Sequence, residues 1–415
     1  MDSIDVIDIR NTSCVLPEES LRDEIVHGLA GNAVIHAVCE EGFPIVQWKK
    51  SIPTGQFLPS EDICFEGLTF LVQSDELAIL DKYGWEIATL LAGPTNPVAT
   101  LTSPQERLEE DNPGDLHLTV VDLGAGRLDK AECLLRSIDK ETCRLGGLNR
   151  PAKISTTYCA VDIQYQELRA RLCDLLRGNP IFSNGCHEDR EGKIIVRGVC
   201  GSYLDSLDLL QNDGLTRDTL AFNNGQEKIM QRKCILWLGS SLTNMSLPQA
   251  SIFLGRFATG VLRAGDTLLV GVDHCRDIKK VKAAYSEESD CWRAYVRNGV
   301  KNAGAILGGD AAAKMNGGSN WDYVTRWDTV NGRHMRFVRS RTRVSFEISS
   351  SSPCDRATAT VEMEEGEYIL IAQSYKHSLA NVERCFQEAG LDILKRWTKD
   401  QSDCSLYLLG KERGI

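Results

Sequence analysis

Short apolar runs alternate with amphipathic segments along the chain from about residue 117 onward. Leu118–Leu123 is an apolar run that ends in Gly124-Ala125-Gly126, and Leu128–Ile138 has the periodicity of a helix with one buried face. Repeated units of this kind predict an α/β fold, a parallel sheet with helices on both of its faces. The further strands expected are Thr156–Ile163, Lys193–Cys200, Lys233–Leu238 and Thr267–Val272, the further helices are Tyr165–Arg177 and one starting at Asp205, and Glu141–Lys153 is expected to be a loop.

The alternation is interrupted and then returns near the end of the chain. Residues 276–345 are rich in charged, glycine and aromatic residues and lack a strand–helix rhythm. A strand is expected at Glu367–Ser374, followed by a helix at Leu379–Ala389 that ends before Gly390. Two final strands, Asp392–Thr398 and Ser405–Leu409, predict a terminal pair that closes the sheet with an antiparallel last strand.

The length of the chain predicts more than one domain. Its 415 residues exceed the roughly 250–300 residues at which a single core usually divides. We expect a Rossmann-like core formed by residues 81–275 and the returning segment 376–415. A second, substrate-binding domain is expected from residues 1–80, which should hold several helices before the sheet begins, and from the insertion 276–375.

The charge of the chain excludes some classes of partner. Its net charge is −11 and its pI is about 5.3, whereas binding to nucleic acid or an anionic membrane needs clustered Lys and Arg. Met1–Asp5 has neither the basic nor the apolar region of a signal peptide, and no apolar run reaches the ~18 residues of a membrane span. We therefore expect a soluble, cytoplasmic protein without nucleic-acid or membrane partners.

The cysteines do not form a recognisable disulfide or metal framework. Their number, 15, is odd, and no C-x-x-C pair occurs, which is typical of free thiols in a reducing compartment. The polar segment Cys186-His187-Glu188-Asp189 has no second ligand pair at metal spacing, so no metal site is expected.

The glycine-rich segment that ends the first predicted strand is the candidate cofactor site. Glycines at Gly124 and Gly126 let the backbone approach a ligand closely, and the next helix offers free N–H groups. A nicotinamide fingerprint would need a glycine where Asp129 stands, so pyrophosphate binding is disfavoured. A carboxylate beside the loop suits a sulfonium with an amino-acid tail, and a plain glycine-rich turn is the alternative.

Asp162 ends the second predicted strand and can complete this site. A carboxylate at that position can accept hydrogen bonds from both hydroxyls of a ribose. A helix N-cap is the alternative role for Asp162, and the glycine loop upstream favours the ligand role.

Several motifs in order along most of the chain are similar to one enzyme family. The chain resembles the histidine Nα-methyltransferases of ergothioneine biosynthesis, and more closely their fungal relatives, the 4-dimethylallyltryptophan N-methyltransferases of ergot-alkaloid pathways. The motifs are Val6–Arg10, Gln47-Trp48, Asp122–Gly126 with Asp129-Lys130, Tyr158–Asp162, Leu238–Asn244, Ala284-Tyr285, Gly332–His334, Ser374–Lys376, Ala389–Leu391, Trp397 and Leu406–Leu409.

The resemblance implies a class I S-adenosylmethionine-dependent methyltransferase and a role for each candidate residue. Gly124, Lys130 and Asp162 would hold the methionine tail and ribose, Ser202 and Tyr203 would lie near the adenine, and Gly239 would follow the fourth strand. Asn244 would reach the amino-acid head of the substrate, with Tyr285 and Ser374 lining the pocket from the second domain. A helix cap or turn remains the alternative for Asn244, and an ordinary core position for Tyr285.

The departures from the family pattern bear on the substrate. The histidine enzymes carry a carboxylate where this chain has Ala372, so histidine is disfavoured as the acceptor. The family's Tyr-Pro segment corresponds to Phe70-Leu71-Val72, so a tyrosine hydroxyl that would contact the substrate amine is missing.

The function expected is methylation of the amine of an amino-acid-derived small molecule in a specialised, fungal-type pathway. We expect Asn244 and Tyr285 to orient the amine, and His334 is a further candidate proton acceptor. Another acceptor (phenol, carboxylate or peptide amine), a non-catalytic cofactor-binding module and an NAD-dependent oxidoreductase are the alternatives. The sequence does not indicate the oligomeric state.

Overall fold

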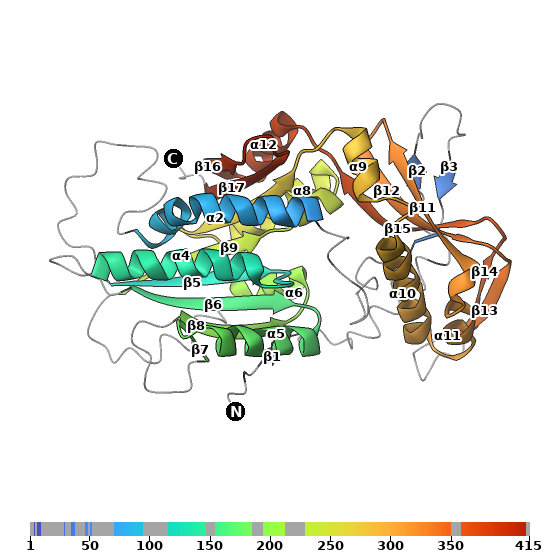
Figure 1. Cartoon of the computed structure of the whole chain (residues 1–415), viewed down its shortest axis with the longest axis horizontal. Coiled ribbons are helices and arrows are strands. Elements are labelled where there is room, and N and C mark those ends of the chain that lie inside the picture. Colours follow the sequence, from blue (N-terminus) through green and yellow to red (C-terminus); the bar gives the residue numbers. More distant parts are fainter. Residues whose placement is uncertain are drawn as a thin grey trace.

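The computed structural model describes residues 4, 6–9, 29, 35–37, 46–48, 50–51, 70–93, 115–146, 154–184, 194–211, 229–349 and 358–411. Figure 1 shows a large sheet covered by helices and, beside it, a smaller sheet with helices of its own. Among the helices described, none combines the length and hydrophobicity needed to cross a bilayer.

The described strands of the main sheet follow the order β1-β8-β6-β5-β9-β10-β17-β16, with β7 beside β8. Strands β1 and β5 to β10 pair in parallel, whereas β17 is antiparallel to both of its neighbours. This confirms the predicted Rossmann-like sheet with an antiparallel last strand. The strands are β1 (Val6–Asp8), β5 (Leu116–Leu123), β6 (Ile154–Asp162), β7 (Phe182–Ser183), β8 (Ile194–Cys200), β9 (Met230–Trp237), β10 (Thr267–Asp273), β16 (Leu391–Thr398) and β17 (Cys404–Lys411).

Each face of the main sheet is covered by helices over its own apolar core. Side chains of β5 alternate between the two, since Leu118 and Val120 join one cluster and Val121 and Leu123 join the other. Burial on both faces explains why these strands are almost continuous apolar runs. One face carries α2 (Phe70–Ala92), α4 (Asp129–Gly146) and α5 (Tyr165–Gly178), and the other carries α6 (Tyr203–Gln211), α8 (Leu247–Gly260) and α12 (Leu379–Glu388).

Helix α4 is longer than the sequence pattern predicts. The expected loop Glu141–Lys153 is wrong for its first six residues, which continue the helix to Gly146. Glu141 is 1% exposed, yet its carboxylate accepts hydrogen bonds from Arg144 at 2.7 Å and from Trp85 at 3.2 Å. A polar segment can stay helical against the core because these partners satisfy its buried charge.

Two N-terminal elements belong with the main sheet rather than with the second domain. Residues 1–80 are assigned above to the substrate domain, but β1 pairs with β8 and α2 packs along α4. The buried Ile79 and Leu80 of α2 join the core under β5. A helical pattern alone does not tell which sheet the helix covers, and three residues are too short for a periodic strand signal.

The smaller sheet is built mainly from the insertion. Within the described residues its strand order is β11-β12-β15-β4, with β4 the one N-terminal contribution. The strand expected at Glu367–Ser374 is β15. The elements are β4 (Lys50–Ser51), β11 (Trp321–Asp328), β12 (Arg333–Ser340), β15 (Tyr368–Tyr375), the pairs β2 (Ile35–Ala37) with β3 (Val46–Trp48) and β13 (Val344–Ser349) with β14 (Thr358–Met363), α9 (Ile278–Ala284), α10 (Asp290–Leu307), α11 (Gly309–Met315) and η5 (Gly318–Asn320).

Candidate active site

The glycine loop after β5 is held by the end of β6. The N–H groups of Gly124 and Ala125 both donate to the carbonyl of Val161, at 2.9 and 3.0 Å. Gly124 has a φ of +70°, and a Cβ there would lie 2.7 Å from the Tyr203 hydroxyl. Glycine is therefore required at this position for both the turn and the close approach of the tyrosine ring.

Asp162 lies at the carboxyl edge of the same sheet. Its carboxylate accepts hydrogen bonds from the N–H groups of Gly126 at 3.3 Å and Gln164 at 3.1 Å. The N-cap of α5 is Gln164, so Asp162 does not cap this helix. An ionised carboxylate has about four acceptor positions, and Asp162 thus keeps room for two hydroxyl donors.

Ser202 and Tyr203 follow β8 at the start of α6. The Ser202 hydroxyl donates to Asp205 at 2.7 Å and accepts from its N–H at 3.2 Å, so it stabilises the first turn of the helix. The Tyr203 ring lies edge-on to Trp237 with centroids 5.9 Å apart. Burial raises the pKa of Tyr203, and its hydroxyl stays protonated beside the glycine loop.

Glu76 is a buried carboxylate in this site that the sequence did not point to. It comes from α2, is fully buried, and accepts a 2.7 Å hydrogen bond from Lys130. Both of its oxygens also lie within 2.9 Å of the Gly239 N–H group. Glu76 therefore joins two predicted cofactor residues, so the Lys130 charge already has a carboxylate partner. Nearby, burial raises the pKa of Asp122 to about 6 against the opposing hydrogen bond from Tyr158.

The sequence feature that could have indicated a residue such as Glu76 lies in strand β10. Gly271 interrupts the apolar run of β10, and a Cβ on it would lie 1.8 Å from a Glu76 oxygen. A glycine within a buried strand marks the close approach of another group. That pattern could have indicated a neighbour, although not which one.

The predicted substrate residue Tyr285, which follows α9, lies next to another, Ser374 of β15. The Tyr285 ring stacks on that of His334 with centroids 4.6 Å apart, and its hydroxyl is hydrogen-bonded to Ser374. Burial alone would raise the pKa of Tyr285, but Lys376, Arg336 and the Ser374 hydrogen bond outweigh it and lower the pKa. Burial and nearby cations hold the pKa of His334 well below its usual range.

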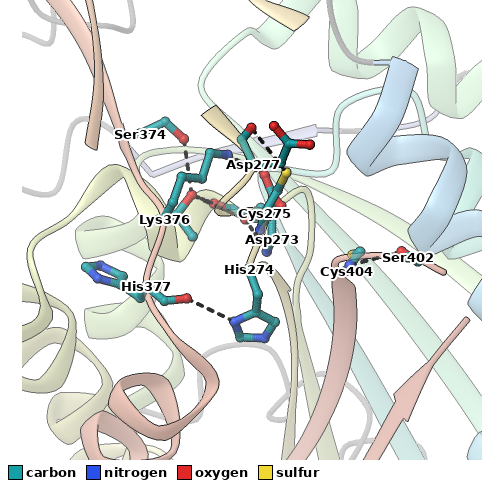
Figure 2. Close-up of polar contacts among 11 residues, drawn as sticks. Asp273, His274, Cys275, Asp277, Ser374, Lys376, His377, Ser402 and Cys404 are labelled. Carbon is teal, nitrogen blue, oxygen red and sulfur yellow. Dashed lines mark hydrogen bonds and ion pairs between the residues drawn. The ribbon is translucent and has the colours of Figure 1, made fainter. Parts of the chain in front are cut away.

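The two sheets meet where β15 passes the turn after β9. The Ser374 and Thr243 hydroxyls are 3.5 Å apart, and Lys376 forms an ion pair with Asp273 at the end of β10. Figure 2 shows the Lys376 side chain directed toward Asp273, with Ser374 on the same strand. The catalytic candidates from the two sheets are thereby brought to a common edge.

Asn244 is exposed at the end of the short 3-10 helix η4 (Ser241–Asn244), next to Thr243. The helix that follows, α8, has Ser246 as its N-cap, and the Ser246 N–H donates to Gln249 at 3.0 Å. Asn244 is thus not the cap of α8. The segment Cys186–Asp189 lies outside the described residues, which contain no group of three or more His, Cys, Asp or Glu placed to hold a metal.

The model of the histidine-specific, S-adenosylmethionine-dependent methyltransferase family matches residues 62–411. The chain belongs to this family. Family membership gives the cofactor, S-adenosylmethionine, and the strand order with its antiparallel terminal pair is that of a class I methyltransferase sheet.

Three relatives of this chain are fungal proteins. Ergothioneine biosynthesis protein 1 of Neurospora crassa is 29% identical over 84% of this chain, and the match spans only 32% of that longer protein. N-methyltransferase dtpB of Aspergillus flavus is 27% identical over 93% of this chain and 87% of its own length. 4-Dimethylallyltryptophan N-methyltransferase easF of Trichophyton verrucosum is 25% identical over 70% and 74% of the two chains.

The described residues fit S-adenosylmethionine at the carboxyl edge of the main sheet. Gly124 and Gly239 both have positive φ, so the backbone at both loops presents no side chain to a ligand. Asp162 retains acceptor positions for hydroxyls, and the buried carboxylate of Asp122 disfavours a phosphate at this edge.

Proposed function

We propose that this chain transfers the methyl group of S-adenosylmethionine to the amine of an amino-acid-derived small molecule. The observation that carries the proposal is the meeting of two sets of side chains. The contact of Ser374 with Thr243 and the ion pair of Lys376 with Asp273 join the strand next to Tyr285 to the loops of the main sheet, which supports a site shared by the two sheets. The relatives named as N-methyltransferases support transfer to nitrogen.

In this proposal the chain positions the two reactants. The cofactor is held by Gly124, Lys130, Asp162, Ser202, Tyr203 and Gly239. When bound, the cofactor supplies an activated methyl group on a sulfonium, so no covalent enzyme intermediate is needed. The chain also acts on the methyl acceptor, through Asn244, Tyr285 and Ser374.

The amine attacks only when it is neutral, so the site must favour the unprotonated amine. Burial of an ammonium group lowers its pKa, and hydroxyl or amide acceptors then orient the lone pair. The Tyr285 hydroxyl, next to Ser374, is proposed as a polar group that orients this lone pair. Asn244, exposed at the main-sheet side, orients the head of the acceptor.

The acceptor is proposed to have an apolar or aromatic side chain and to belong to a specialised, fungal-type pathway such as alkaloid biosynthesis. Ala372 provides no charged partner for an imidazole, and burying an unpaired polar ring is costly. The described cysteines are all free thiols, which supports a cytoplasmic enzyme.

Mass spectrometry of products tests this function. The purified protein would be incubated with S-adenosylmethionine and a panel of tryptophan, 4-prenylated tryptophan, phenylalanine, tyrosine, leucine and histidine. We expect an N-methylated product from an aromatic or apolar member and little from histidine. Efficient histidine methylation, or methyl transfer only to oxygen, would contradict the proposal, and cofactor binding without any transfer would indicate a non-catalytic module.

A further inference from the structure

Five arginines line a pocket at the edge of the second sheet. Strand β11 is the end strand in the described order of that sheet, and α10 packs against it. A pocket of about 400 Å³, a size common for small-molecule sites, is lined by both elements and by the end of β12. We call it the arginine pocket, after Arg293, Arg297, Arg326, Arg339 and Arg341.

The arginine pocket is positively charged in a chain that is negatively charged as a whole. Asp322 and Glu287 are the carboxylates of its described lining, so the five arginines leave an excess of three positive charges. The whole chain has a net charge of −11. Like charges gathered in a concave surface repel one another and create a field that attracts anions. The local reversal of sign indicates a site for an anion that carries several charges.

Asp322 holds two of the arginines in place without using all of their donors. It pairs across the ladder with Arg339, and its carboxylate accepts hydrogen bonds from Arg339 at 2.8 Å and from Arg341 at 2.6 Å. A guanidinium has five N–H donors, so both arginines keep donors for a ligand. Their side chains are 43% and 52% exposed, and a ligand can therefore reach them from solvent.

Arg293 and Arg297 line the pocket from α10. They are four residues apart, so they lie on the same face of the helix. Arg293 is paired with Asp290, whose side chain is 95% exposed, and an ion pair of that kind is weak. The planar guanidinium matches the oxygen atoms of a phosphate group in bidentate geometry. Guanidiniums from the sheet and from the helix can thus contact one phosphate-bearing ligand.

We propose that the arginine pocket binds a phosphate-bearing small molecule, with Arg297 and Arg341 as its main contacts from the helix and the sheet. A diphosphate would offset the excess charge of the lining. The described lining includes none of the residues proposed to bind the cofactor or the methyl acceptor, so this is a second site. Its existence does not depend on which molecule the enzyme methylates.

Calorimetry on the full chain tests the arginine pocket without measuring turnover. The protein would be saturated with S-adenosylhomocysteine, which keeps the probes out of the cofactor site, and titrated with inorganic pyrophosphate, ADP or an oligoglutamate peptide. We expect one equivalent of pyrophosphate to bind, more weakly as salt screens the charges. Tighter binding of ADP would identify a nucleotide as the ligand, and equal binding a simpler phosphate compound. No saturable binding of either up to about 1 mM, or binding of the peptide alone, would overturn the proposal.

Variants show whether the phosphate binds at this pocket. Arg297→Gln and Arg341→Gln change exposed side chains, so both proteins should fold, and each should weaken pyrophosphate binding about 10-fold through loss of a charged hydrogen bond. The double variant should lose about 100-fold, because the two residues contact the ligand from different elements. Arg341→Lys keeps the charge and should retain part of the affinity.

Arg177→Gln is the matched control, since it removes one positive charge from the surface of α5, where the Arg177 side chain is 75% exposed. It should leave pyrophosphate affinity unchanged. Melting temperatures of all variants show that any loss of binding is not a loss of folding. An unchanged affinity in the double variant would place the phosphate elsewhere, and an equal loss in Arg177→Gln would show an effect of overall charge alone. Either result would overturn the assignment.

Discussion

Asp162 is the residue on which the cofactor side of the site can be tested most directly. Its carboxylate accepts hydrogen bonds from two backbone N–H groups, and we assign its other two acceptor positions to the ribose hydroxyls of the cofactor. Asp162→Ala should weaken S-adenosylmethionine binding by about 1.5–3 kcal/mol, the value of hydrogen bonds to a charged group. Isothermal calorimetry measures this directly. Asp174→Ala, on the exposed surface of α5, is the control, and equal affinities for all three proteins would remove Asp162 from the site.

Asn244 and Ser246 lie two residues apart, and comparing variants at the two positions distinguishes a substrate-binding role from a helix-capping role. Asn244→Ala should lower turnover roughly 100-fold at nearly unchanged cofactor affinity, because a misplaced attacking atom costs about that much. Ser246→Ala, at the N-cap of α8, should instead lose about 1 kcal/mol of stability with normal turnover. Melting temperature and kinetics measured on both variants decide between the two roles. A fully active Asn244→Ala enzyme would show that the amide has no part in the reaction.

At the scale of elements, the sequence predicts those parts of the fold whose partners are adjacent or periodic. The parallel strands β5, β6, β8, β9 and β10 were predicted because burial on both faces makes them apolar runs, and α5 because its apolar positions recur at helical spacing. The last turns of α4 were missed because Glu141 is satisfied by Trp85, a residue far away in the chain. Glu76 was not predicted for the same reason, because its partners Lys130 and Gly239 are far away in the sequence. Contacts between distant segments leave little trace in local pattern.

Gly271 allows α2 to approach β10. A methyl group there would lie 1.8 Å from the Glu76 carboxylate, so Gly271→Ala must displace α2 or the strand. We expect a loss of about 1–3 kcal/mol in the free energy of unfolding, the usual cost of overpacking, together with weaker cofactor binding. Denaturant unfolding checks this against Gly178→Ala, where an added Cβ meets nothing within 4 Å. If the two variants proved equally stable, the close approach of Glu76 to β10 would be wrong.

At the scale of the whole molecule, the ion pair between Lys376 and Asp273 joins the two sheets. Both side chains are at least 90% buried, so Lys376→Met would leave an unpaired carboxylate and should cost about 3–5 kcal/mol. The double variant Lys376→Met/Asp273→Asn should recover most of that stability without recovering turnover, since Tyr285 also loses the nearby charge. Unfolding and kinetics of the single and double variants form the test. A single variant as stable as the parent chain would mean that the pair does not hold the sheets together.

The placement of β17 between β10 and β16 has a consequence for how the chain assembles during synthesis. Strands β5, β6, β8, β9 and β10 come from one continuous stretch and can pair as soon as β10 has been made. The partner of the free edge of β10 arrives only after the whole second sheet, a delay on the order of ten seconds at about 5–20 residues per second. Through that interval Leu268 and Val270 lie on an unpaired edge strand, which is a template for pairing with other chains. The edge of β10 is therefore the place where a nascent chain of this fold is most exposed to mispairing.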